Sequence, residues 1–145
     1  MPLMFFNISL FIAGLFTLTL GSVHFFFPKL LDFAHAIPKD GPPLRPFHLG
    51  PIRYATQRSD VHGIAWLMNH HTSFVLVSIG LIDIFGGRWL QSPTGRWLAL
   101  WISAWWFLRA ASQLYLGRRR GDWLILAGFS ALAVLHLLVG LASLR

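Results

Sequence analysis

One charged side chain, Arg109, falls inside a long apolar run, about eight residues or roughly 12 Å along a helix from the nearer end of that run. A guanidinium buried in a membrane needs an anion or several hydrogen-bond acceptors. The acids closest to the apolar runs are Asp60, Asp83 and Asp122, and each falls at the end of a run. Two interpretations stay open. Either Arg109 bonds to carbonyls and hydroxyls of neighbouring helices, or it holds the anionic group of a ligand or of another subunit.

Amide and imidazole side chains fall near the same depth as Arg109 in the sequence. Asn69 and His70 lie at about the same depth in another apolar run, Gln113 follows Arg109 by one helical turn, and His24 lies near the end of the first run. These groups bind carboxylates and phosphates well. Together they predict a polar pocket for an anionic or amphipathic small molecule of the lipid, quinone or isoprenoid type. The alternative is that they only hydrogen-bond across helices.

Histidine also raises the question of haem and metal. A bis-histidine haem needs two histidines at one depth, whereas His24, His70 and His136 fall at roughly 5, 12 and 22 Å from one boundary. Haem is therefore the weaker alternative, and the cofactor is left unknown. His24, His62 and Asp60 form a weak two-histidine, one-carboxylate candidate, and no metal is the favoured prediction. The chain has no Cys or Glu and no nucleophile–base pair, so we do not predict catalysis, although a histidine-dependent membrane enzyme is retained as an alternative.

The elements that position these residues follow from composition. Of 145 residues, 55% are hydrophobic and 12% charged, and the mean hydropathy is +0.59. A soluble domain has about 25% charged residues, and a membrane-spanning helix needs about 20 apolar ones. The sequence therefore predicts an all-α integral membrane protein, residues 1–145 forming one transmembrane domain. It is expected to be an up-down-up-down bundle of four helices, at residues 3–27, 62–85, 96–116 and 123–144.

The connections between these runs differ in length. Residues 86–95 and 117–122 are short, which favours antiparallel neighbours. Residues 28–61 contain six prolines together with aromatic and apolar side chains. Connections longer than about 12–15 residues usually carry function or are disordered. We therefore predict that residues 28–61 fold as a cap over one mouth of the bundle.

Basic residues are distributed unequally about the runs. The loop 28–61 has five Lys and Arg and residues 118–120 are all Arg, against Arg88, Arg96 and Arg145 on the other side. The positive-inside rule then predicts a cytoplasmic long loop and both termini outside. The same rule explains most of the basic residues behind the net charge of +7, so nucleic acid is not predicted as a partner. The predicted partners are membrane lipids, and either other membrane subunits or further copies of this chain.

Two segments resemble a group of small four-span bacterial membrane proteins of unknown function, similar in layout to families of the DoxX type. They are Ala13-Gly14…Leu20-Gly21-Ser22-Val23-His24 and Trp66…Asn69…Ser73…Gly80-Leu81. The resemblance implies a bacterial inner-membrane location and a four-helix bundle. Those families carry no established activity, so it assigns no functional residue.

Two functions are therefore predicted as alternatives. The favoured one is the binding of a small molecule in the polar pocket in the cytoplasmic half of the bundle. The other is that of a non-catalytic accessory subunit in a larger membrane complex, in which case Arg109 or the loop 28–61 contacts a partner protein. Small size, few catalytic groups and many aromatic residues are typical of such subunits.

Overall fold

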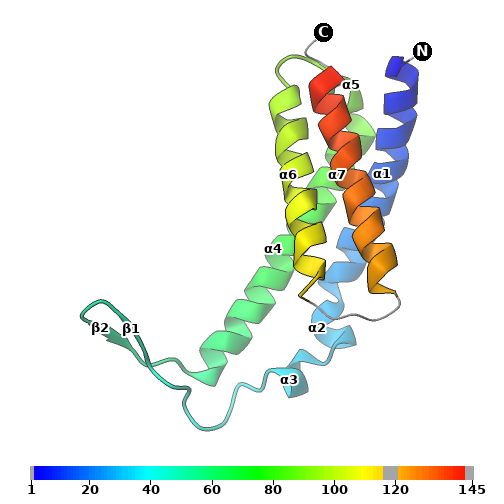
Figure 1. The fold of residues 1–145 in the computed structure, drawn as a ribbon. Coiled ribbons are helices and arrows are strands. Elements are labelled where there is room, and N and C mark those ends of the chain that lie inside the picture. The colour runs from blue at the N-terminus through cyan, green and yellow to red at the C-terminus, as the bar shows by residue number, and fades with distance from the viewer. Residues whose placement is uncertain (1, 116–120, 143–145) are drawn as a thin grey trace. The chain divides into compact units, whose positions relative to one another are not determined.

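The computed structural model describes residues 2–115 and 121–142, and these residues are mainly helical. The expected all-α class is confirmed, with one short hairpin added (Figure 1). The elements are α1 Pro2–Phe25, α2 Phe27–Leu30, α3 Phe33–Ala36, β1 Phe47–Leu49, β2 Ile52–Tyr54, α4 Arg58–Phe85, α5 Gly87–Leu90, α6 Arg96–Gln113 and α7 Asp122–Ala142.

Three helices are long and apolar enough to cross a membrane, namely α1 from Met4, α4 and α7. The helix expected at 96–116 forms as α6, but its 18 residues span only about 27 Å and include Arg96 and Arg109. It is not among the three apolar helices in the described part of the chain. A fourth span is therefore a proposal.

The helix ends differ from the predicted ones by a few residues. Helix α4 begins at Arg58, four residues before the apolar run, because the Asp60 side chain accepts a hydrogen bond from the Gln57 amide at 2.8 Å and closes the first turn. Helix α1 ends at Phe25, and a separate short helix, α2, follows at Phe27. The predicted ends at 116 and 144, and the basic residues 118–120 and 145, lie outside the described residues.

The chain forms two compact units, and each is described by itself. Unit 1 comprises Met1–Phe16 and Ile79–Arg145, and unit 2 comprises Thr17–Ser78. In unit 1, α6 and α7 pack antiparallel along their length (Figure 1). The Trp106 ring lies 5.2 Å from the Phe129 ring, and the Ser103 hydroxyl donates to the Ala133 carbonyl at 2.8 Å. Interhelical packing of this kind, with small residues at the contact, is how membrane helices associate.

Glycines allow α1 and α4 to approach closely within each unit. In unit 1 a Cβ added to Gly14 would lie 2.8 Å from the Gly80 carbonyl oxygen. In unit 2 a Cβ added to Gly21 would lie 2.8 Å from the Val77 backbone nitrogen. The sequence spacing of Ala13, Thr17 and Gly21 predicts such a contact face, and all three residues are buried.

Unit 2 also contains the cap segment, which we define as residues 26–57 between α1 and α4. Its two strands form an antiparallel hairpin in which Leu49 pairs with Ile52. Gly50 makes the turn with a φ of +58°, a conformation that favours glycine. The side chains of Leu49, Ile52 and Tyr54 are exposed. The cap segment therefore contains two short helices and a hairpin, and the hairpin was not predicted from the sequence. That this segment covers a mouth of the bundle stays a prediction.

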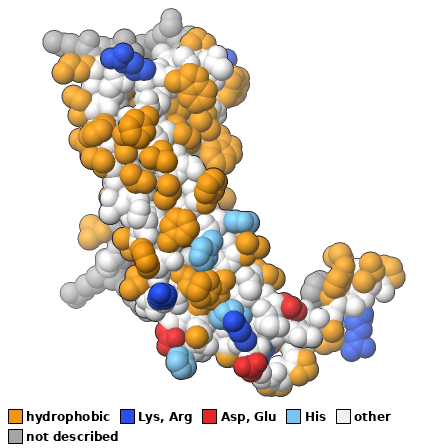
Figure 2. All heavy atoms as spheres, turned by 180° about the vertical axis from the view of Figure 1, so that it is seen from behind, with side chains coloured by type: hydrophobic (Ala, Val, Ile, Leu, Met, Phe, Trp, Pro, Cys, Tyr) orange, Lys and Arg blue, Asp and Glu red, His pale blue; other side chains and the backbone are white. Residues whose placement is uncertain are grey.

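The helices carry many exposed apolar side chains. Figure 2 shows hydrophobic side chains over much of the helical surface in view, with histidine side chains among them, whereas acidic side chains are visible only toward the end with the cap segment. A soluble monomer rarely exposes so continuous an apolar surface. This distribution is typical of helices that contact lipid.

Candidate functional site

A closed set of hydrogen bonds joins α1 to α4 in unit 2. The Ser73 hydroxyl donates to the Asn69 carbonyl at 2.8 Å, so the His24 Nδ1–H must donate to the Ser73 oxygen, 3.1 Å away. The Asn69 side-chain amide donates to the His24 carbonyl at 3.1 Å. Asn69 and Ser73 are buried. The structure thus brings His24 and Asn69 together, and the bonds it gives them fasten one helix to the other.

His70 is turned away from this set. Its Nδ1 donates to the Trp66 carbonyl one turn earlier at 2.8 Å, and its ring stacks on the Trp66 ring at 5.5 Å. The side chain is partly exposed. His70 is therefore presented at the surface of α4, one residue around the helix from Asn69.

Arg109 and Gln113 lie on α6 in unit 1. The Arg109 guanidinium is half-buried and lies 5.5 Å from the centre of the Phe129 ring, a cation–π contact. Among the described residues no carboxylate pairs with it. Gln113 donates from its side-chain amide to the Asp122 carboxylate at 3.3 Å. Arg109 therefore keeps its guanidinium available for an anion.

The five predicted pocket residues are thus divided between the units. His24, Asn69 and His70 belong to unit 2, and Arg109 and Gln113 to unit 1. A single pocket formed by all five stays a prediction.

The weak metal candidates are each engaged elsewhere. His62 Nδ1 donates to the Ile37 carbonyl at 2.6 Å, and the Asp60 carboxylate accepts from the Gln57 amide. Within residues 2–115 and 121–142, no three His, Cys, Asp or Glu side chains converge on a point that could hold a metal ion. The haem alternative is not tested, because His24 and His136 belong to different units.

A buried pair in unit 1, Asp83 of α4 and His136 of α7, was not predicted from the sequence. His136 Nε2 lies 3.0 Å from Asp83 Oδ1, and both side chains are fully buried. Counted from the helix ends that the positive-inside rule predicts to be cytoplasmic, Asp83 falls at a rim and His136 falls apart from the other polar groups. Counted from the opposite ends, Asp83 lies about 3 Å and His136 about 9 Å along its helix. That shared end was the signal in the sequence.

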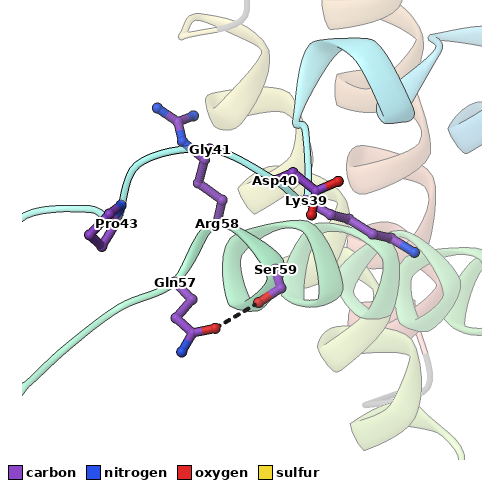
Figure 3. A pocket seen from close by; sticks show the side chains of 7 residues that line it. All are labelled: Lys39, Asp40, Gly41, Pro43, Gln57, Arg58 and Ser59. Atoms are coloured by element: carbon purple, nitrogen blue, oxygen red, sulfur yellow. Dashed lines mark hydrogen bonds between the residues drawn. The ribbon is translucent and has the colours of Figure 1, made fainter.

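A cavity of about 480 Å³ lies where the cap segment meets the start of α4 (Figure 3). The cap segment supplies Lys39, Asp40, Gly41, Pro43 and Gln57, and the first turn of α4 supplies Arg58 and Ser59. Arg58 Nε donates to the Pro42 carbonyl at 3.1 Å, which fixes the base of its side chain. A Cβ added to Gly41, whose φ is +131°, would lie 2.9 Å from that Nε. Gly41 therefore leaves the space that Arg58 uses.

A second cavity of about 500 Å³ shares Lys39 and Ser59 with the first. Its remaining lining residues are His62, Gly63 and Trp66, which follow along α4. A Cβ added to Gly63 would meet nothing within 4 Å. A polar cavity with two cations therefore adjoins one lined by an indole ring. Neither cavity was predicted from the sequence, because the positive-inside rule alone is enough to explain Lys39 and Arg58 there.

An exposed ion pair lies earlier in the cap segment. Asp32 accepts a hydrogen bond from His35 Nδ1 at 2.6 Å. That bond, aided by the opposite charges, raises the pKa of His35 and lowers the pKa of Asp32. Both side chains face solvent, so the pair reports on local structure more than it stabilises the fold.

Comparison of this chain with protein-family models, curated proteins and solved structures finds no match.

Proposed function

We propose that this chain is a four-span protein of a bacterial inner membrane that binds an anionic amphiphile at its cap segment. The observation that carries the proposal is the pair of adjoining cavities, one polar and one beside Trp66, with Lys39 and Ser59 lining both. An amphiphile has the matching chemistry, because one end of it is charged and the other apolar.

The polar cavity is suited to an anionic headgroup. Lys39 and Arg58 supply two positive charges against the single negative charge of Asp40. Arg58 has one nitrogen fixed by the Pro42 carbonyl, which holds the guanidinium in place at lower entropic cost. Gln57 and Ser59 add polar groups, and the positive end of the α4 dipole lies at the same point. Phosphate and carboxylate headgroups share the chemistry that this set recognises.

The second cavity is suited to the apolar part of the same molecule. It runs beside α4, where Gly63 leaves open space and Trp66 presents a partly exposed indole. Indole rings are favoured at the membrane interface, where one side meets water and the other meets lipid. A lipid, quinone-like or isoprenoid molecule fits this arrangement.

Arg109 is proposed as a second anion contact. Its half-buried guanidinium has no acidic partner in the described residues, and residues 116–120 contain no acid but three Arg. The three Arg that follow Arg109 and the cations of the cap segment both belong to the side that the positive-inside rule predicts to be cytoplasmic. Anion contacts on the same predicted side of the membrane are consistent with a protein that associates with anionic lipid.

The test is ligand binding in nanodiscs, with native mass spectrometry and a titration of a labelled anionic lipid against a zwitterionic one. The double variant Lys39→Gln with Arg58→Gln is expected to weaken anionic-lipid binding by about tenfold or more, the loss of charged contacts worth more than about 1.4 kcal/mol. Gly41→Ala should weaken it as well, because it displaces Arg58. The matched control is Arg53→Gln, which removes an exposed cation of the hairpin that lines neither cavity.

Equal weakening by Arg53→Gln would show that overall charge, and not the cavity, sets binding. Unchanged binding by the double variant would refute the cap-segment site.

A second candidate function is that of an accessory subunit, favoured by the exposed apolar side chains of the hairpin, Leu49, Ile52 and Tyr54. Native mass spectrometry of protein gently extracted from its host membrane separates the two. A reproducible small-molecule mass on a monomer or homodimer supports amphiphile binding, whereas fixed-stoichiometry co-migration with other proteins and no ligand supports the subunit.

A further inference from the structure

The most deeply buried ionisable groups of the described chain are Asp83 and His136, and the proposed amphiphile site does not use them. Their side chains are fully buried, and they meet across 3.0 Å between Asp83 Oδ1 and His136 Nε2. Ionisable side chains within membrane helices are costly and are candidates for functional sites, proton relays among them. We propose that the Asp83–His136 pair is a proton-binding site, loaded and unloaded through the cavity that Asp83 lines at this end of unit 1.

The hydrogen bonds define how many protons the pair holds. His136 Nδ1 lies 2.8 Å from the Leu132 carbonyl, which only accepts, so Nδ1 must carry a hydrogen. A neutral His136 therefore has a bare Nε2 facing Asp83 Oδ1. If Asp83 were also ionised, two lone pairs would face each other. One further proton, on either Oδ1 or Nε2, turns that repulsion into a hydrogen bond and leaves the pair with no net charge.

The carboxylate has a second oxygen that is not used. Asp83 Oδ2 is buried and has no hydrogen-bond partner among the described residues. Asp83 also lines a cavity of about 480 Å³ together with Asn7 and Arg88. A water in liquid occupies about 30 Å³, so this cavity has room for several waters. Because the Asp83 side chain is fully buried, water in the cavity reaches the carboxylate only when the intervening side chains open briefly. The proton then leaves the pair as hydronium and returns by the same path.

Charged side chains around the pair also influence whether it holds the proton. The other charged side chains in the described part of unit 1 are Arg88, Arg96, Arg109 and Asp122, with Tyr115 also titratable. Arg88 of α5 lines the cavity, and Arg96 of α6 lies level with Gly140, one turn from His136. Helix α1 contributes Asn7 and Phe11 there, and neither is charged. The deprotonated pair carries one negative charge, so these cations favour it. The repulsion between the lone pairs on Asp83 Oδ1 and His136 Nε2 has the opposite effect and favours the protonated pair.

The test follows His136 in the full-length protein, reconstituted in nanodiscs and labelled with ¹⁵N on histidine. The ring-nitrogen shifts are recorded from about pH 4 to about pH 9, with the Asp83 carboxyl stretch followed by infrared spectroscopy. We expect one transition at which both groups change together, and its loss from the infrared spectrum in Asp83→Asn. A His136 that keeps one protonation state across this range would make the pair a fixed structural bond and overturn the proposal.

Replacing a charged residue of the cavity wall tests whether the cavity serves the pair, and it leaves Asp83 and His136 themselves unchanged. Arg88→Gln is expected to move the transition upward by about one pH unit, because a cation that favours the deprotonated form is removed. Arg109→Gln is the control, since Arg109 lies against Phe129, about 10 Å along α7 from His136. Equal shifts in the two variants would overturn the assignment of the cavity. The wild-type titration decides the proposal even if Asp83→Asn fails to fold.

Discussion

Buried polar side chains in this chain mostly hold helices together. Ser103 donates to Ala133 across α6 and α7, and Asn69 donates to His24 across α1 and α4. Such bonds average about 0.6 kcal/mol in a membrane protein, with a maximum near 1.7. The total number of interhelical hydrogen bonds therefore matters more for stability than any single bond. Removing one of them should still lower stability measurably.

Replacing Ser103 with Ala should destabilise the fold by about 0.6 to 1.7 kcal/mol, because the hydroxyl that bonds α7 is removed. Ser112→Ala is the matched control, since that hydroxyl donates to Leu108 of its own helix and is not fully buried. Reversible unfolding in detergent micelles measures both. Equal losses in the two variants would contradict an interhelical role for Ser103.

The exposed Asp32–His35 pair should titrate with shifted pKa values. The hydrogen bond to Asp32 raises the pKa of His35, so its contribution to the local turn is lost as the pH rises through that raised value. Asp32 has a lowered pKa, so its contribution is lost as the pH falls through that lowered value. The turn is therefore best formed between the two.

An NMR titration of His35 measures this, with Asp32→Asn as the partner variant. Asn tolerates the left-handed backbone at this position, where φ is 47°, so the turn survives while the charge is removed. The pKa of His35 is expected to return to the ordinary range of histidine in Asp32→Asn. An unchanged pKa would mean that the two side chains do not interact in solution.

The candidate residues were predictable in type but not in partnership. Sequence depth singled out Arg109, Asn69 and His24, and the structure gives each of them a polar or aromatic contact. The depth count from the predicted cytoplasmic ends missed the Asp83–His136 pair. Asp83 then falls at a rim and His136 does not, and the two look related only when depth is counted from the opposite helix ends. Spacing along a helix gives the depth of a side chain in the membrane. Which side chains meet depends also on how each of the two helices is rotated about its axis, and that cannot be read from one sequence.

At the scale of elements, close helix contacts depend on residues without side chains. A Cβ added to Gly14 would lie 2.8 Å from the Gly80 carbonyl oxygen and 2.9 Å from Asp83 Cβ. Backbone atoms cannot move aside as a flexible side chain can. Gly128 of α7, by contrast, has nothing within 4 Å of an added Cβ. Replacing Gly14 with Ala therefore tests helix packing, whereas replacing Gly128 with Ala tests helix propensity alone.

Gly14→Ala should cost about 1–3 kcal/mol of stability, the usual penalty for overpacking. Gly128→Ala should be neutral or slightly stabilising, because Ala favours a helix over Gly by about 1 kcal/mol. Thermal unfolding of both variants in the same detergent gives the comparison. A Gly14→Ala variant as stable as Gly128→Ala would show that α1 and α4 lie farther apart than described.

The main helices were predictable because apolar runs of sufficient length have few alternatives to a helix. The ends of the helices were less predictable. Helix α4 begins among the charged residues Arg58 and Asp60, which a hydropathy pattern assigns to the loop. The hairpin was not predicted, because each strand has three residues and the period-2 pattern needs more. Its turn depends on Gly50 followed by a proline, a local signal hidden among five other prolines of the loop 28–61.

At the scale of the whole molecule, the open question is whether α6 crosses the membrane. Its four Trp and two Arg lower its hydropathy, yet its 18 residues reach about 27 Å, close to the hydrocarbon thickness. Trp97 near one end is placed as an interfacial aromatic would be. A crossing α6 puts residues 94 and 121 on opposite sides of the membrane. An α6 that lies on the surface leaves them on one side.

The chain contains no Cys, so single-cysteine variants can decide the topology without background labelling. Ala36, Thr94 and Gly121 are exposed positions in the cap segment and at the two ends of the α6 region. With four spans and a cytoplasmic cap segment, a membrane-impermeant maleimide should label Thr94→Cys in intact spheroplasts. Ala36→Cys and Gly121→Cys should be labelled only after permeabilisation, because the eight Lys and Arg on their side are retained in the cytoplasm. Labelling of Thr94→Cys and Gly121→Cys from the same side would remove the fourth span, and labelling of Ala36→Cys in intact spheroplasts would place the proposed amphiphile site outside the cell.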